Sequence, residues 1–116
     1  MTALGIDFGT KTIGLAYSLN GFIFTLPPIK NIPSKYNQIQ SLIGEYSIEK
    51  IYVGLSEGKI AKLTLKFVSE LQAIINLPVE TVEEAVSTIE AQEIQKINKK
   101  SIDSTSAAVI LRRVIS

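Results

Sequence analysis

Short apolar runs separated by turn signals fill the first 26 residues, a pattern typical of an antiparallel strand meander. Gly9 permits a tight turn after the first run, and Asn20-Gly21 is a two-residue hairpin signal. Pro27-Pro28 should end the third run, because proline cannot donate a hydrogen bond to a strand ladder. We therefore expect three strands, at residues 2–7, 12–19 and 22–26.

Helical spacing of apolar residues dominates from residue 34 onward, interrupted by two short apolar runs. Ser34 is a candidate N-cap for a helix over residues 36–46, and Ser101 for a closing helix over residues 102–115. The two short runs predict strands at residues 51–53 and 78–82, and the remaining stripes predict helices at residues 59–75 and 86–97. The inner side of the helix at residues 59–75 should hold Ile60, Leu63, Phe67, Leu71 and Ile74.

The order of these elements predicts one domain over residues 1–116 with an α/β fold. An antiparallel meander followed by alternating helices and strands implies a mixed sheet with helices on its faces. No linker, internal repeat or low-complexity tract divides the sequence.

Composition narrows the chemistry that the chain can perform. Its 116 residues are 46% hydrophobic, include no cysteine and no histidine, and carry a net charge of +1. The missing residue types exclude thiolate and histidine metal sites, cysteine nucleophiles and Ser-His-Asp triads. Hydrolytic chemistry would therefore use carboxylates, hydroxyls, lysines or a hard metal ion. Without an apolar run of membrane length or a signal-peptide pattern, we expect a soluble, cytoplasmic protein that does not enter a membrane.

Three carboxylates stand at the ends of expected elements. Asp7 closes the first strand, Glu84 follows the fifth, and Asp103 opens the last helix. Each also has a local interpretation: Asp7 could cap turn amides, Glu84 could belong to a solvated helix start, and Asp103 could cap its own helix.

The last helix gives the strongest indication of a site. Asp103 shares a helical face with Ala107, Ile110 and Val114, so its carboxylate should point toward the sheet. A buried acid is costly unless it is paired, capped or bound to a cation. Because ligand sites of open sheets lie at the carboxyl ends of strands, the three acids could share one edge. They could there hold two hard divalent cations about 3.5–4 Å apart, an arrangement suited to phosphodiester displacement.

Four motifs resemble a known family. The chain resembles the YqgF-type family of the RNase H-like superfamily, described as Holliday-junction resolvases and as pre-16S ribosomal RNA nucleases. The resemblance covers nearly the whole chain, and its first and last motifs are specific in combination. The motifs are Gly5-Ile6-Asp7-Phe8-Gly9-Thr10-Lys11-Thr12-Ile13-Gly14, Val53-Gly54-Leu55, Val82-Glu83-Glu84-Ala85-Val86-Ser87-Thr88 and Ile102-Asp103-Ser104-Thr105-Ser106-Ala107-Ala108-Val109-Ile110-Leu111.

The resemblance implies an RNase H-like fold with strand order 3-2-1-4-5 and metal-binding acids at Asp7, Glu84 and Asp103. It implies a nuclease that uses Mg²⁺ or Mn²⁺ on structured nucleic acid, and it favours processing of the 5′ end of pre-16S rRNA during ribosome biogenesis. Branched DNA is the alternative substrate. Ribosomal precursor particles are the expected partners, and the chain is expected to be a monomer or a weak dimer.

Lysines supply candidate phosphate contacts around such a site. Lys59, Lys62 and Lys66 fall at i, i+3 and i+7 on the outer side of their helix, a spacing that an ordinary solvated face also produces. The full set of candidates is Lys11, Lys59, Lys62, Lys66, Lys99 and Lys100.

The sequence departs from the family pattern at several positions. Ala85 stands where the family usually carries arginine, Glu83 replaces an aspartate, and Thr12 occupies a position that is commonly basic. After Gly54-Leu55 the family's longer polar loop is cut to Ser56-Glu57-Gly58. The lost arginine and the shortened loop favour a second interpretation, a non-catalytic member that binds RNA or a ribosomal partner, whereas the retained acids argue against it. A third interpretation starts from the Asp-x-Gly-Thr turn, which is similar to a phosphate loop of sugar kinases and actin-like ATPases. We rank it last, because those proteins close a second domain over the nucleotide.

Overall fold

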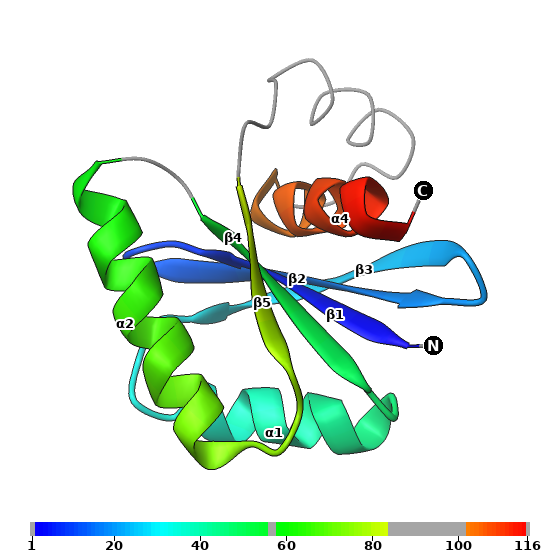
Figure 1. Ribbon diagram of the computed structural model, residues 1–116, viewed down its shortest axis with the longest axis horizontal. Helices are drawn as coiled ribbons and strands as arrows, with labels where there is room; N and C mark the ends of the chain where they lie inside the picture. The colour runs from blue at the N-terminus through cyan, green and yellow to red at the C-terminus, as the bar shows by residue number, and fades with distance from the viewer. Residues whose placement is uncertain (1, 56–57, 84–101, 116) are drawn as a thin grey trace.

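The computed structural model describes residues 2–55, 58–83 and 102–115, and of residues 102–105 and 115 it describes the backbone alone. A five-stranded sheet has helices on both faces (Figure 1). The elements in chain order are β1 (Ala3–Phe8), β2 (Thr12–Leu19), β3 (Phe22–Lys30), α1 (Lys35–Glu45), β4 (Lys50–Leu55), α2 (Lys59–Ile74), β5 (Val79–Glu83) and α4 (Ile102–Ile115).

The strand order is β3-β2-β1-β4-β5, which confirms the order that the family resemblance implied. β1 pairs antiparallel with β2 and β2 pairs antiparallel with β3, whereas β4 pairs parallel with both β1 and β5. The expected meander and mixed sheet are therefore both present. Because β1, β4 and β5 run in one direction, their carboxyl ends lie at a single edge, which is at the upper left in Figure 1.

β3 is longer than we expected from the sequence. The prediction that Pro27-Pro28 ends it is wrong, because the strand continues to Lys30. Two features accommodate the prolines: β3 is an edge strand, and the register shifts between Ile13 and Leu15, so that both prolines lie opposite Gly14. A bulge on an edge strand is where proline costs least, since the missing donor faces no ladder partner.

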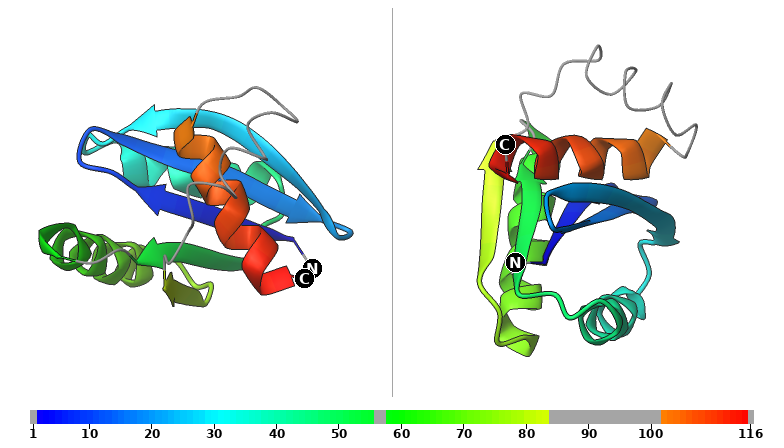
Figure 2. Two further views of the ribbon diagram at one scale, coloured as in Figure 1. Left: turned by 90° about the horizontal axis from the view of Figure 1, so that it is seen from above. Right: turned by 90° about the vertical axis from the view of Figure 1, so that its right-hand side faces the viewer.

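The helices lie on both faces of the sheet (Figure 2), and an apolar cluster joins each face to its helices. The larger one joins the strands to α1 and α2, with Phe67 and Leu71 of α2 among its buried side chains. The smaller one joins the opposite face to α4 through Ala107, Ala108 and Leu111. Among the described residues, no helix has both the length and the apolar character needed to cross a membrane.

The buried side of α2 differs from the predicted one. Phe67 and Leu71 are buried as expected, but Leu63 and Ile74 are 47% and 45% exposed, and Thr64 is buried instead. Burial of Thr64 is tolerated because its hydroxyl donates to the carbonyl of Ile60 at 2.9 Å. The buried face of α2 is thus turned about the helix axis toward Thr64, and Leu63 and Ile74 lie at the border of that face.

The predicted helix caps have different outcomes. Ser34 occupies the N-cap position of α1, but its side chain makes no capping bond to a helix amide and instead accepts a hydrogen bond from Gln38. Ser101 and the helix predicted at residues 86–97 lie outside the described residues.

Gly5 lets α4 lie directly on the backbone of β1. A Cβ atom at Gly5 would lie 2.8 Å from the carbonyl oxygen of Ala107 and 2.7 Å from Cγ of Leu111. We predict that Gly5→Ala lowers the free energy of unfolding by about 1–3 kcal/mol, because α4 must move away from the sheet. The matched control is Gly44→Ala in α1, where nothing lies within 4 Å and the change should stabilise by about 0.5–1 kcal/mol. Urea denaturation of the two variants measures both values, and equal effects would contradict close packing at Gly5.

Candidate metal centre

Asp7 lies one residue before the carboxyl end of β1, on the face of the sheet that α4 covers. Successive side chains of a strand point to opposite faces, so Asp7 shares its face with Ala3 and Gly5, which contact α4. Leu4 and Ile6 point to the other face and join the larger cluster. Asp7 is therefore half-buried near the carboxyl end of β1, and its side chain lies on the α4 face of the sheet.

The strands on both sides of Asp7 carry glycine at the adjacent position. Asp7 pairs with Gly14 of β2, and Gly54 of β4 comes one residue after Val53, the partner of Ile6. Neither neighbour has a side chain that could fill the space beside the carboxylate. Glycine in a strand interior is typical of places where a ligand or another backbone approaches closely. We did not predict this arrangement. The pair Asp7 and Gly14 could have been found from the sequence, because a turn over residues 9–12 places residue 8 opposite residue 13 and residue 7 opposite residue 14.

The second predicted acid follows a strand that ends at the same edge. β5 ends at Glu83, and Val82 on that strand packs against the cluster beneath α4. The expectation that β1 and β5 end at one edge is therefore confirmed. Glu84, the next residue in the sequence, lies outside the described residues.

The third predicted acid, Asp103, is the second residue of α4. α4 crosses the sheet over β1, β2 and β3, and its residues Ala107 and Leu111 lie over Gly5 in the middle of β1 (Figures 1 and 2). Ala107 and Ile110, which share a helical face with Asp103, are fully buried. The side chain of Asp103 lies outside the described part of the structure, so its convergence with Asp7 stays a prediction.

The candidate phosphate contacts lie around this edge where the structure describes them. Lys11 is exposed in the turn between β1 and β2. Lys59, Lys62 and Lys66 are exposed on α2, which begins where β4 ends (Figure 1). Lys99 and Lys100 lie outside the described residues.

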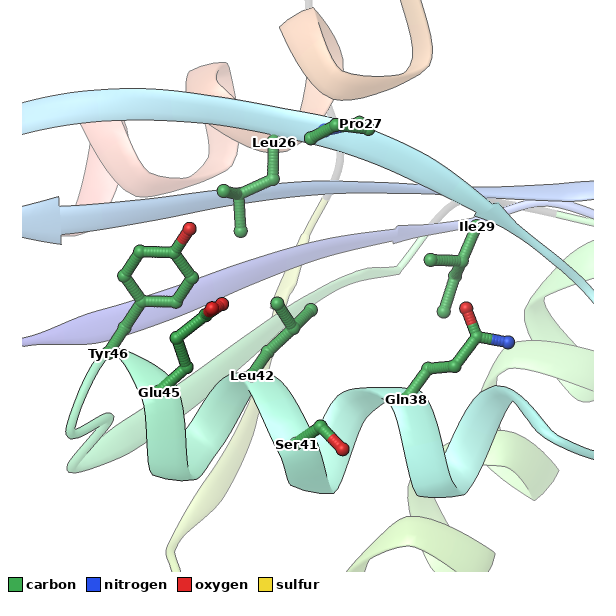
Figure 3. Close-up of a pocket in the computed structure, with 8 residues that line it drawn as sticks. All are labelled: Leu26, Pro27, Ile29, Gln38, Ser41, Leu42, Glu45 and Tyr46. Atoms are coloured by element: carbon green, nitrogen blue, oxygen red, sulfur yellow. The ribbon is translucent and has the colours of Figure 1, made fainter.

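Two cavities lie away from Asp7. One, of about 350 Å³, is lined by residues of β3 and α1, with Leu26 and Ile29 facing Leu42 and Tyr46 (Figure 3). Burial, together with the nearby Glu45 carboxylate, raises the pKa of the Tyr46 hydroxyl. This cavity opens on the α1 face of the sheet, and its only charged lining group is an acid, so it does not suit phosphate. A second cavity, of about 490 Å³, lies between α1 and α2.

The donor chemistry fits a hard divalent cation. The predicted ligands offer carboxylate oxygens alone, and the chain has neither histidine nor cysteine to favour zinc or copper. Within residues 2–55, 58–83 and 102–115, no three acidic side chains gather at one point. Since Asp7 is the one predicted ligand whose side chain is described, the three-acid site stays a prediction.

Comparison with known proteins gives consistent results. The family model described as RuvX, Holliday junction resolvase, matches residues 1–116. A protein of Desulforamulus reducens named "Putative pre-16S rRNA nuclease" is 33% identical over 129 residues, covering 97% of this chain and 94% of its own. A protein of Actinobacillus pleuropneumoniae serotype 5b with the same name is 35% identical over 128 residues, covering 95% and 93%.

Solved structures support the fold. The chain superimposes on T. thermophilus RuvC, solved in complex with a Holliday junction substrate, with a TM-score of 0.69 and 16% identity, covering 99% of this chain and 93% of that one. The fowlpox virus Holliday junction resolvase gives a TM-score of 0.62 and 12% identity, covering 99% and 98%. The predicted RNase H-like fold is thus confirmed, and the chain belongs to the RuvX family of Holliday junction resolvases, the family that the YqgF-type motifs indicated.

Proposed function

We propose that this protein is a metal-dependent nuclease that hydrolyses phosphodiester bonds of structured nucleic acid, and that it processes the 5′ end of pre-16S rRNA. The observation that carries the proposal is the placement of Asp7 at the shared carboxyl edge, between Gly14 and Gly54 and on the α4 face. Membership of the RuvX family and the names of the relatives support it.

In this proposal Asp7, Glu84 and Asp103 hold Mg²⁺ or Mn²⁺, with two ions bound. The bound ions would supply charge stabilisation at the scissile phosphate and an activated water. The backbone would position these residues, because Asp7 lies on a strand paired with β2 and Asp103 lies on α4, which packs on Gly5. Lys11 would contact a phosphate next to this centre. The other candidates for contacts with the nucleic-acid backbone are Lys59, Lys62, Lys66, Lys99 and Lys100.

A branched DNA substrate is the second candidate. The description of the matching family as Holliday junction resolvase favours it. Four-way junctions and folded rRNA precursors both present phosphates from several strands, so one acidic edge flanked by lysines could serve either substrate.

We also propose that the enzyme is cytoplasmic, that it acts on ribosomal precursor particles, and that it works as a monomer or weak dimer.

A cleavage assay tests the proposal. We expect the wild-type protein to cut a pre-16S rRNA fragment in Mg²⁺ or Mn²⁺ and to be inactive in chelator, with slower cutting of a four-way DNA junction. Preferential cutting of the junction would make resolvase activity the main function. Binding without cutting of either substrate would instead support the non-catalytic interpretation that Ala85 favours.

The α2 lysines should affect binding and not chemistry. We predict that Lys59→Ala with Lys62→Ala weakens RNA binding about tenfold and lowers the slope of log affinity against log salt by roughly one to two units. Both side chains are exposed on a helix that starts at the candidate edge, so each can reach one phosphate. Titrations at several salt concentrations measure the slope. The matched control is Lys35→Ala on α1, and an equal loss in the control would show that α2 has no special role.

A further inference from the structure

Asn31 holds the turn between β1 and β2 by two hydrogen bonds. Its side-chain Nδ2 donates to the carbonyl oxygen of Gly9 at 2.8 Å, and its backbone N–H donates to the carbonyl oxygen of Lys11 at 2.9 Å. One residue, which directly follows the last residue of β3, thus binds the carbonyls on both sides of Thr10. Asn31 is half-buried, whereas Thr10 and Lys11 at the tip of the turn are exposed.

Steric contact restricts the same turn from within. A Cβ atom at Gly9 would lie 2.4 Å from the carbonyl oxygen of Thr12, closer than real Cβ atoms approach backbone oxygen. The two ends of the turn are therefore in direct contact, and only glycine fits. A turn closed in this way and bonded from outside has few alternative conformations.

The two bonds also set the direction of groups that can meet a phosphate. The chain has no cis peptide among its described residues, so the C=O and N–H of each peptide unit point in opposite directions. With the Gly9 carbonyl bound to Asn31, the N–H of Thr10 faces away from Asn31. The Lys11 backbone is likewise anchored through its carbonyl, which limits the space that its ammonium group can sweep.

We propose that Asn31 is a positioning residue that orients Lys11 toward the phosphate of nucleic acid bound beside Asp7. The inference rests on the proposed function, because it assigns Asn31 a role in that same site. The turn follows Asp7 by two residues, so a phosphate at the carboxylate lies within range of a lysine at the turn. A preorganised lysine loses less side-chain entropy on binding than a freely moving one, and this raises affinity.

The experiment measures binding of a pre-16S rRNA fragment to wild type, Asn31→Ala, Lys11→Ala and the double variant across a range of salt concentrations. We expect Asn31→Ala to weaken binding about three- to tenfold, the range of one lost hydrogen bond, and to lower the salt slope by up to one unit. Lys11→Ala should do the same, and the double variant should lose no more than Lys11→Ala alone. Asn31→Gln, which keeps the amide donor, should recover part of the affinity.

Three results would overturn the inference. One is wild-type affinity in Asn31→Ala. Another is a double variant whose losses add, because Asn31 would then act independently of Lys11. The third is an equal loss in Asn37→Ala, a matched control on an exposed position of α1.

Failure of the proposed function gives a different result. If the wild type binds no structured nucleic acid, hydrogen exchange of the backbone amides of Thr10 and Lys11 still tests whether the hydrogen bonds of Asn31 hold the turn. Faster exchange in Asn31→Ala than in wild type supports positioning by Asn31, and unchanged exchange refutes it.

Discussion

Asp7→Asn should reduce cleavage of structured RNA by more than about 100-fold while leaving RNA binding within about twofold of wild type. Substitutions in the outer shell of metal sites already cost about 10- to 100-fold, so loss of a direct ligand should cost more. Binding should survive, because lysines meet the phosphates whereas the carboxylates act through the metal ions. Asparagine has the same shape as aspartate, so pairing with Gly14 is retained. Asp103→Asn should give the same separation of cleavage from binding.

The matched control for Asp7→Asn is Glu83→Gln. Glu83 is exposed at the end of β5 and alternates with Val82, so it points away from the α4 face. We expect Glu83→Gln to cleave as fast as wild type, and Glu84→Gln to lose activity as Asp7→Asn does. Cleavage rates under single-turnover conditions test both. Full activity in Asp7→Asn would remove Asp7 from the metal centre.

Divalent metal should raise the melting temperature of the wild-type protein by about 10 °C when Mn²⁺ is present at 100 times its dissociation constant. A ligand that binds only the folded state at that concentration stabilises it by about 2.7 kcal/mol. For a domain of this length, 1 kcal/mol corresponds to a shift of roughly 3–6 °C. Differential scanning fluorimetry with a Mn²⁺ series, at constant ionic strength, measures the shift.

Asp7→Asn should lose most of this stabilisation. In the absence of metal, the variant should be at least as stable as wild type, since three carboxylates at the proposed site would repel one another and the variant removes one of them. Glu83→Gln, which leaves the three acids intact, should keep the whole shift. A full Mn²⁺-dependent shift in Asp7→Asn would mean that the metal binds elsewhere on the protein.

The local sequence pattern predicted the bounds of an element correctly where tertiary contacts do not change them. β2 has the bounds of its apolar run, Thr12–Leu19, and α4 has the bounds of its apolar stripe, Ile102–Ile115. β3 runs past Pro27 because it is an edge strand with a bulge, and neither property is visible in the strand's own sequence. The buried side of α2 depends on where the sheet lies, so the apolar Leu63 is exposed while Thr64 is covered.

Only the part of the candidate site that depends on local sequence was predictable. Asp7 at a strand end follows from a run of apolar residues that stops beside a glycine turn. Its flanking residues Gly14 and Gly54 come from two other strands, and Asn31 reaches the turn from the end of β3. Such contacts depend on strand order and register, and in this sequence the family resemblance, not the local pattern, implied the strand order.

Manganese-induced broadening of backbone amide signals tests the proposed metal centre most directly. A paramagnetic ion broadens the signals of nearby amides, so a Mn²⁺ titration followed by two-dimensional NMR locates the site without requiring activity. We predict that the amide signals of Asp7, Gly14 and Gly54 broaden first in the wild type and stay sharp in Asp7→Asn. Early broadening at other carboxylates, such as Glu45 on α1 or Glu80 on β5, with sharp signals around Asp7, would contradict a metal centre at this edge.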